Sequence, residues 1–490
     1  MAKKLLAILA ALCLVAAMGS VGASAVLEYE YDQEFATGET VFYTSEYGKG
    51  EFNILVIPDA HQTADEDANL IAYIEATIKY MELEKVPLDL IIFLGDSVTS
   101  SAAASPATIA TAVGRLLAPV KAAKIPYTLV FGNHDLGDTP EGSISGAELL
   151  RIWKDAGGTI DFEYEVYEEI EPAIPPVMDG ETEVTPGVDA VWGMVKKTVS
   201  VPLFAAPDVT EYNPATGTTN FKYTIYKKLY RDMVWDDGRI THTSTSVKNS
   251  NGQIVNNTYL KTVPFAQLFL FDVGAKAEGE DGYDYVQLNQ LEWFDDNNDD
   301  GVPAYVFQHI PLPEVYTGGF FLKSPFNLEL PWTRKILDVN YCGKANFVNM
   351  VGTVLEAPNP PKYSDGEFEM ITAPGNVQAA FFGHDHINNY VEKFPEIDLV
   401  QLPGAAWNGS YGTYLVRGGS FVSIHPNAAN TGVTYSSDFF TYRQASRVPG
   451  YGNISVNKGL VNDWFRVFPF LFQNFLIDIL APIRWIGGGF

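Results

Sequence analysis

Residues Ile54–His61 read ILVIPDAH, a continuous apolar run that ends in Asp59 and His61. Short continuous apolar runs are typical of strands that are buried on both faces of a parallel sheet. In open sheets of this kind, ligands collect beyond the carboxyl ends of the strands. The stretch therefore predicts a buried strand with two functional side chains directly after it.

The same pattern of an apolar run followed by polar residues recurs along the chain. The further examples are Leu90–Leu94 before Asp96, Tyr127–Phe131 before Asn133, His134 and Asp135, Ala304–Phe307 before His309, and Ala379–Phe382 before His384 and His386. One such motif alone is more often a turn than a ligand. Together, however, the motifs contain five of the seven histidines, which a scatter of core histidines does not predict. We expect their side chains to meet at one edge of a sheet.

Segments with helical periodicity separate the first three apolar runs. Thr63 and Glu66 have the spacing of a capping box, which predicts that a helix begins there and continues towards Pro87. Ser105 followed by Pro106 predicts the start of a second helix. Strands that alternate with helices form strand–helix–strand units, so the sequence predicts an α/β fold.

The composition describes a globular protein with a strongly acidic surface. The chain has 490 residues and a formal net charge of −28. Its length suffices to bury one or two cores without a metal ion or a disulfide. A surface of this charge repels nucleic acid and anionic membranes, so we expect no nucleic-acid-binding surface. A phosphate-bearing substrate would need a local positive centre, and bound divalent metal ions can supply one.

The N-terminus has the features of a signal peptide over residues 1–25. Lys3 and Lys4 precede the apolar run Leu5–Met18, and Ala23–Ala25 supplies the small residues of a cleavage site. The run is shorter than the ~20 apolar residues that span a bilayer, so a retained membrane anchor is the weaker alternative. We therefore expect cleavage near Ala25 and export to the exterior, the periplasm or the cell envelope.

The rest of the chain divides into a main domain and a C-terminal extension. The domain, at residues 26–425, contains an acidic insertion or cap at about 136–262, in which Asn251-Gly252 predicts a hairpin turn. Residues 426–490 are expected to pack on that domain. Their end, Asp463–Phe490, is aromatic but interrupted by prolines and polar residues, so it is not a transmembrane span. A packed helix and contact with a membrane surface are the alternatives for this tail.

In their order along the chain, the polar motifs resemble those of the calcineurin-like metallophosphoesterase superfamily. The motifs are D-x-H at Asp59, G-D at Gly95, G-N-H-D at Gly132, H at His309 and G-H-x-H at Gly383. The resemblance covers about Asn53 to Tyr390. It implies a four-layer αββα sandwich of two mixed sheets with a large insertion, a fold classed as α/β or α+β.

The resemblance also implies which residues hold metal ions. Two divalent ions, from among Mn, Fe, Zn and Co, would share the carboxylate of Asp96 as a bridge. The first ion would be held by Asp59, His61 and His386, and the second by Asn133, His309 and His384.

A less specific similarity concerns a subgroup of this superfamily. The segment Gln308–Glu314, which reads QHIPLPE, is similar to a non-purple subgroup related to purple acid phosphatases. Purple enzymes have glycine at the position of His61 and tyrosine at the position of Thr99. This chain departs from both, so we expect no tyrosinate-to-iron colour.

The resemblance makes His134 and Asp135 the candidate catalytic residues. His134 would protonate the leaving oxygen or stabilise charge on the phosphate, with Asp135 orienting its ring. The implied reaction is hydrolysis of a phosphomonoester by attack of a metal-bridging hydroxide. A phosphodiesterase acting on nucleotides, lipids or wall polymers stays open as an alternative, and an inactive surface binding module is an alternative of another class. Because every predicted ligand position and His134 has a competent residue type, the sequence favours an enzyme.

Overall fold

The computed structural model describes residues 42–44, 50–63, 67–98, 105–137, 144–171, 177–179, 182–185, 191–213, 218–230, 232–234, 240–242, 247–248, 254–255, 259–273, 282–316, 350–353, 358–407, 416–429 and 432–456. The predicted signal peptide and the aromatic tail Asp463–Phe490 lie outside these residues, so both remain predictions. Within the described ranges, no helix combines the length and the apolar character needed to cross a membrane.

The first three apolar runs form adjacent strands of a five-stranded sheet. Its strands are, in order, β22 (Val433–Thr441), β21 (Gly418–Pro426), β2 (Phe52–Ile57), β3 (Leu90–Leu94) and β4 (Tyr127–Val130). β2, β3 and β4 are parallel, and β21 pairs antiparallel with both β2 and β22. Every residue of β2, β3 and β4 is buried, which explains why their sequences are apolar without alternation.

The later apolar runs lie in a second sheet, of nine strands in the described part of the chain. Its path runs through β1 (Phe42–Tyr43), β10 (Thr219–Tyr230), β15 (Tyr259–Phe271), β16 (Ala304–Gln308), β18 (Val377–Phe382), β20 (Asp398–Gln401), β19 (Asn389–Lys393) and β17 (Met350–Thr353), with β9 (Val209–Tyr212) beside β10. Neighbours from β15 to β20 pair in parallel, whereas β10 pairs antiparallel with β15, and β19 with β20 and β17. Both sheets are therefore mixed.

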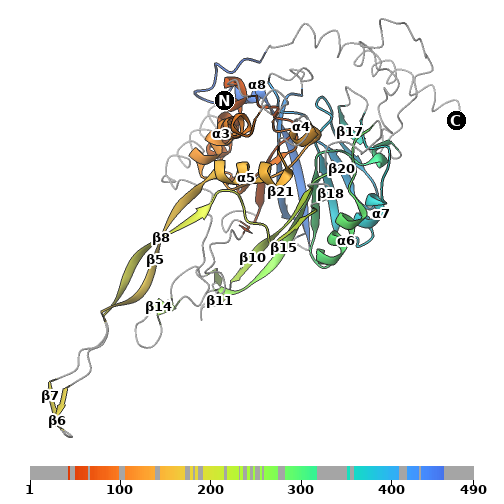
Figure 1. The fold of residues 1–490 in the computed structure, drawn as a ribbon. Coiled ribbons are helices and arrows are strands. Elements are labelled where there is room, and N and C mark those ends of the chain that lie inside the picture. Colours follow the sequence, from red (N-terminus) through yellow and green to blue (C-terminus); the bar gives the residue numbers. More distant parts are fainter. Residues whose placement is uncertain are drawn as a thin grey trace, which may run out of the picture.

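Helices cover the outer face of each sheet, and the inner faces of the two sheets pack together (Figure 1). α2 (Ala68–Glu84), α3 (Pro106–Ala123) and α5 (Gly146–Gly157) lie on the five-stranded sheet, and α6 (Leu288–Asn297) and α7 (Glu367–Thr372) lie on the nine-stranded sheet. The side chains of β16 alternate between two cores, because successive side chains of a strand point to opposite faces of its sheet. Tyr305 and Phe307 belong to the core between the sheets, and Val306 belongs to the core under α6. The predicted four-layer sandwich of two mixed sheets is confirmed.

Two helix starts test the capping predictions. Ser105 caps α3 by accepting a hydrogen bond from the backbone N of Thr108 at 3.2 Å, and Pro106 is the first helical residue, as predicted. α2 begins about one turn later than predicted. Its cap is Asp67, which accepts a hydrogen bond from the backbone N of Leu70 at 3.1 Å. The predicted start at Thr63 is wrong, because the buried Asp67 carboxylate already satisfies the first turn.

The predicted insertion at 136–262 contains projecting hairpins and also β9 and β10 of the nine-stranded sheet. The hairpin of β5 (Thr159–Glu171) and β8 (Val191–Pro202) extends away from the sandwich, with β6 (Val177–Asp179) and β7 (Thr182–Thr185) at its far end (Figure 1). Shorter pairs are β11 (Asp232–Val234) with β12 (Ile240–His242), and β13 (Val247–Lys248) with β14 (Ile254–Val255). The last pair flanks Asn251-Gly252, as a hairpin requires, although that dipeptide lies outside the described residues.

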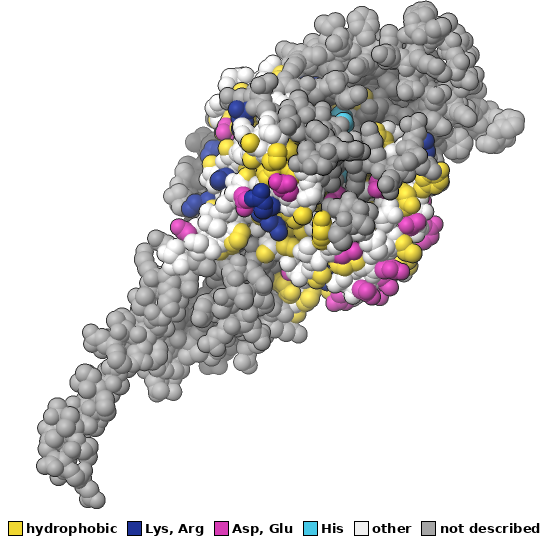
Figure 2. All heavy atoms as spheres, in the orientation of Figure 1, with side chains coloured by type: hydrophobic (Ala, Val, Ile, Leu, Met, Phe, Trp, Pro, Cys, Tyr) yellow, Lys and Arg dark blue, Asp and Glu magenta, His cyan; other side chains and the backbone are white. Residues whose placement is uncertain are grey.

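Acidic side chains gather on one face of the sandwich, over α6 and the turn that follows it (Figure 2). Asp295, Asp296, Asp299 and Asp300 are exposed there. They contribute to the formal net charge of −28.

Candidate metal centre

The predicted ligands follow strands of both sheets. Asp59, Asp96 and Asn133 come after β2, β3 and β4, whereas His309 and the G-H-x-H motif come after β16 and β18. Backbone hydrogen bonds continue the pairing beyond the strand ends, because the N of Asp59 donates to the O of Gly95 and the N of Gly383 donates to the O of His309, each at 3.0 Å. The loops that carry the ligands are thus held together at one edge of the sandwich.

Six of the ligands form two groups of possible metal donors. Donor atoms of Asp59, His61, Asp96 and His386 lie within 4.8 Å of one another, and so do donor atoms of Asp96, His309 and His384. Asp96 belongs to both groups, which is what a bridging carboxylate requires. The grouping is consistent with a site for two metal ions.

Asn133, the remaining predicted ligand, lies next to Asp96. It is the first residue of α4 (Asn133–Gly137), and the following residue, His134, donates from its backbone N to Oδ1 of Asp96 at 2.7 Å. Asn133 is only 5% exposed. Its amide is therefore buried beside the residue that bonds to the Asp96 carboxylate.

Four buried atoms of these ligands make no hydrogen bond of good geometry to a described residue, although two of them, Oδ2 of Asp96 and Nε2 of His309, form an ion pair 3.2 Å long. The four atoms are Oδ1 of Asp59, Oδ2 of Asp96, Oδ1 of Asn133 and Nε2 of His309. A buried polar atom without a partner costs about 1–3 kcal/mol, and more when it is charged. Carboxylate oxygen, amide oxygen and imidazole nitrogen are donors that divalent transition-metal ions accept. The residues present therefore fit two metal ions, which would satisfy each of these atoms.

The separations between donor atoms fit the same conclusion. Nε2 of His386 lies 3.2 Å from Nε2 of His61 and 3.2 Å from Oδ1 of Asp59. Donors that surround one ion tetrahedrally at ~2.0 Å are about 3.3 Å apart. These three side chains therefore converge as donors around a common ion would.

The backbone of the ligands is strained. Asp59, His61, Asp96 and His384 have positive φ values of 49°, 44°, 48° and 69°. Among the described residues other than glycine, Lys85 and Lys124, which end α2 and α3, are the remaining two with positive φ. Such strain persists only where surrounding contacts over-determine the conformation, and it is concentrated at functional sites.

Contacts outside the donor groups fix how the ligands point. Nδ1 of His309 lies 2.9 Å from the carbonyl O of Leu94. A carbonyl can only accept, so Nδ1 carries a proton and Nε2 is the nitrogen that faces Asp96. Oδ2 of Asp59 accepts a hydrogen bond from the backbone N of His384 at 3.0 Å, which leaves Oδ1 facing His386.

Burial and neighbouring charges set the ionisation of the imidazoles. Burial lowers the pKa of His61 to about 4, and the nearby His386 adds to this effect. Burial likewise lowers the pKa of His384 to about 3, with a further contribution from His309. Burial also opposes charge on His309, but the carboxylate of Asp96, 3.2 Å away, raises its pKa to about 10. Metal binding would therefore displace a proton from His309.

Comparison with known proteins agrees with this geometry. Residues 52–192 match the calcineurin-like phosphoesterase family, and this range carries the D-x-H, G-D and G-N-H-D motifs. The fold brings the later H and G-H-x-H motifs to the same edge. The chain therefore carries a calcineurin-like phosphoesterase region at residues 52–192.

The chain is distantly related to purple acid phosphatases. It is 25% identical over 160 residues to "Probable inactive purple acid phosphatase 14" of Arabidopsis thaliana, covering 29% of this chain and 33% of that protein. It is 27% identical over 133 residues to "Probable inactive purple acid phosphatase 28" of the same plant, covering 25% and 27%. The matches thus span about a third or less of these relatives. A solved dimetal phosphatase from Danio rerio aligns over 80% of this chain and 99% of its own, with 9% identity and a TM-score of 0.38.

His134 and Asp135 differ sharply in exposure. The side chain of His134 is 40% exposed, and its Nε2 lies 4.0 Å from Oδ2 of Asp96. Asp135 is buried and accepts hydrogen bonds from the backbone N atoms of Gly132 at 2.9 Å, Val98 at 2.9 Å and Ser97 at 3.3 Å. These bonds join the G-N-H-D motif to the loop after β3. That Asp135 orients the ring of His134 stays a prediction.

Two groups of contacts around the candidate metal centre were not predicted from the sequence. The carbonyl of Leu94, which orients His309, left no signal because any residue has a carbonyl. The loop after β20 also supports the site, since Ala405 and Ala406 donate from their backbone N atoms to the O atoms of Pro58 and Asp59, each at 2.9 Å. That loop could have been found, because Gly404 follows the end of another parallel strand.

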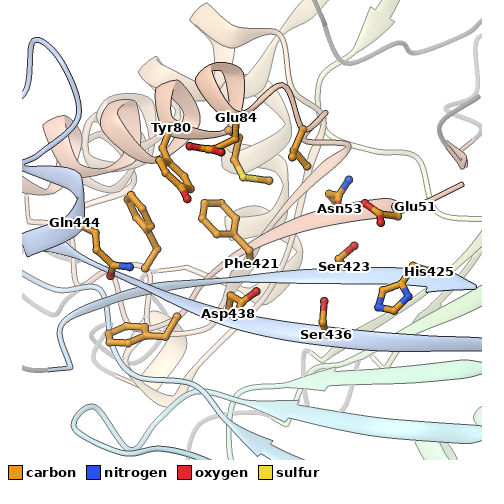
Figure 3. Close-up of a pocket in the computed structure, with 14 residues that line it drawn as sticks. Glu51, Asn53, Tyr80, Glu84, Phe421, Ser423, His425, Ser436, Asp438 and Gln444 are labelled. Atoms are coloured by element: carbon orange, nitrogen blue, oxygen red, sulfur yellow. The ribbon is translucent and has the colours of Figure 1, made fainter. Parts of the chain in front are cut away.

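A cavity of about 570 Å³ lies elsewhere, between α2 and the strands β21 and β22 (Figure 3). Its lining includes the carboxylates of Glu51, Glu84 and Asp438, which disfavour a phosphate anion. Asn53, near the start of β2, also lines it, whereas Asp59 follows the end of that strand. Six residues of strand span about 20 Å, so this cavity is remote from the predicted ligands.

The glycines of the motifs give a first test of the site. A Cβ at Gly132 would overlap Oδ1 of Asp96. We expect Gly132→Ala to destabilise the fold by about 1–3 kcal/mol through overpacking. It should also lower the affinity for Mn²⁺, because it displaces the shared carboxylate. Chemical denaturation and calorimetric titration measure the two effects.

Gly114→Ala is the matched control. A Cβ there meets nothing within 4 Å, and Gly114 lies inside α3, so this variant should gain about 0.5–1 kcal/mol and bind metal like the parent. Parent-like metal affinity in Gly132→Ala would contradict the placement of Asp96 in the site.

Proposed function

We propose that the protein hydrolyses phosphomonoesters outside the cytoplasm with the aid of two divalent metal ions. The observation that carries the proposal is the pair of donor groups that share Asp96 at the motifs of a phosphoesterase family. The family supports a phosphate ester as substrate. The acidic surface supports a small substrate over a polyanion, because it repels large anions while a metal centre attracts a phosphate locally.

Each predicted ligand has a place in this proposal. Asp59, His61 and His386 would hold one ion, Asn133, His309 and His384 would hold the other, and Asp96 would contact both. When bound, the two ions activate water and neutralise charge on the phosphoryl group. The protein itself contributes fixed positions for the donors, through the buried strand ends and the backbone hydrogen bonds between their loops.

His134 is suited to protonate the leaving oxygen. Its side chain is 40% exposed, whereas the side chains of His61 and His386 are 8% and 10% exposed. Its ring centroid lies 5.2 Å from that of His61, so it borders the donor groups while it faces outward. A substrate held over the metals could reach this imidazole, which then acts as a general acid.

An inactive binding module is the competing function. Two of the related plant proteins are named probable inactive purple acid phosphatases. The present chain keeps competent residue types at all seven predicted ligand positions and at His134, which supports activity. Turnover measurements decide between the two functions.

We expect purified protein to hydrolyse nitrophenyl phosphate after incubation with Mn, Fe, Zn or Co ions and to lose the activity when a chelator removes them. The rate on the monoester should exceed the rate on bis-nitrophenyl phosphate. The reverse preference would favour the phosphodiesterase. No turnover of either ester, with two ions bound, would favour the binding module.

Substitution of two histidines should separate metal binding from proton transfer. His309→Ala should lose one of the two ions on dialysis, because it removes a predicted ligand. His134→Ala should keep both ions and lose roughly 10²- to 10⁴-fold in rate on an alkyl phosphate. Its loss on nitrophenyl phosphate should be smaller, because that leaving group needs no proton. Metal analysis and rates on both esters provide the measurement.

His425→Ala is the control for both variants, because Nδ1 of His425 lies 2.9 Å from the O of Pro426, away from the donor groups. If His134→Ala lowers the rate on both esters by the same factor, His134 does not act as the leaving-group acid. Loss of metal from His134→Ala would instead make it a ligand.

The proposed location rests on the sequence of residues 1–25, with Lys3, Lys4 and the run Leu5–Met18 before Ala23–Ala25. We expect the mature protein to begin at Val26. N-terminal sequencing of protein from its native host is the measurement, and an intact Met1 on a cytoplasmic protein would overturn export.

A further inference from the structure

His384 is held by an aromatic contact from outside the five motifs. Its imidazole lies edge-on to the ring of Tyr283, with centroids 4.3 Å apart and planes at 78°. The ring of His309 packs on it as well, at 5.3 Å and 75°. Edge-to-face packing is a favourable and directional arrangement of rings. The orientation of the His384 ring is therefore restricted from two directions.

Tyr283 is in turn joined to the G-H-x-H loop through Asn359. Nδ2 of Asn359 donates to Oη of Tyr283 at 3.2 Å, and the backbone N of Asn359 donates to Oδ1 of Asp385 at 3.1 Å. In the segment Pro358–Pro361, which reads PNPP, Asn359 has the only backbone N–H, because proline has none. A stiff segment thus connects Tyr283 to the residue between the two histidines of the motif.

The conformation of His384 needs such support. Its φ of 69° is unfavourable for a residue with a side chain, and its backbone N is held by Oδ2 of Asp59. The backbone contact fixes where the residue lies, but it does not fix the rotation of the ring. Tyr283 and His309 restrict that rotation, and the centroid of Tyr283 is the nearer of the two.

We propose that Tyr283 is a positioning residue that aims the imidazole of His384 at one metal ion, with Asn359 bracing Tyr283 against the loop. The inference deepens the proposed function, because it takes His384 to be a metal ligand. His384 shares a donor group with Asp96 and His309 and is absent from the group of Asp59, His61 and His386. Tyr283 should therefore affect the affinity for one ion and not the other.

Calorimetric titration of the metal-free protein with Mn²⁺ tests this inference. Tyr283→Leu should weaken one of the two binding steps by roughly 10- to 100-fold, the range typical of residues that orient metal ligands. The other step and the melting temperature of the metal-free protein should stay as in the parent. Tyr283→Phe keeps the ring and should recover most of the affinity, since it loses only the bond to Asn359.

Asn359→Ala provides an independent check on the brace. It removes the side-chain bond to Tyr283 and keeps the backbone bond to Asp385, so its effect should equal that of Tyr283→Phe. The double variant should be no weaker than either single variant, because both remove the same interaction. Tyr212→Leu, at a tyrosine that is 44% exposed on β9, is the control and should bind both ions like the parent.

Several outcomes would overturn the inference. The first is that Tyr283→Leu binds both Mn²⁺ ions with the affinity of the parent. The second is that this variant binds both ions equally more weakly and has a lower melting temperature. The third is that Tyr283→Phe does not recover the affinity. If the parent binds two ions but hydrolyses no phosphate ester, the proposed function fails while the inference about Tyr283 still stands or falls on the titration. A parent that binds fewer than two ions would contradict both.

Discussion

The burial of the Asp96 carboxylate is the constraint on which the rest of the site depends. Oδ1 accepts the backbone hydrogen bond of His134, and Oδ2 lies 3.2 Å from Nε2 of His309 and 3.8 Å from Nε2 of His61. A buried carboxylate is costly unless opposite charge or donors surround it. Burial would raise the pKa of Asp96, but the charge of His309 holds that pKa below its usual range. Histidines from both sheets must therefore converge on this one side chain.

The sandwich supplies the rigidity that this convergence requires. Two parallel sets of strands end at the same edge, and their continuous apolar sequences bury them on both faces. The glycine of the G-D motif allows close packing, because a Cβ at Gly95, where φ is +79°, would overlap the imidazole of His309. Strained ligands and orphaned donors lower stability, and the large core offsets that cost.

Two kinds of residue form the candidate metal centre. Side chains in the motifs point donors at common centres, whereas residues around them fix the direction of each donor. Leu94 orients His309 through a carbonyl, Asp135 ties the G-N-H-D motif to the loop after β3, and Tyr283 packs on His384. Metal chemistry tolerates little error in ligand geometry, so these supporting contacts matter as much as the identity of the ligands.

From its residues alone, the sequence predicted an α/β fold, the strands that carry the motifs and the residue types that meet at their ends. The sandwich of two mixed sheets was implied by the resemblance of those motifs to a known family. The residues allowed the first prediction because burial on both faces leaves an uninterrupted apolar run, and because metal donors are few in kind. The sequence misplaced the start of α2 at Thr63, since several polar residues there could cap a helix and only packing selects Asp67. Only the tertiary structure decided how Leu94 turns His309, and that Tyr283 and Asn359 reach the G-H-x-H loop. Those contacts join residues far apart in the chain through backbone carbonyls, amides and ring faces. Many residue types can supply such groups, so the contacts leave no pattern in a sequence.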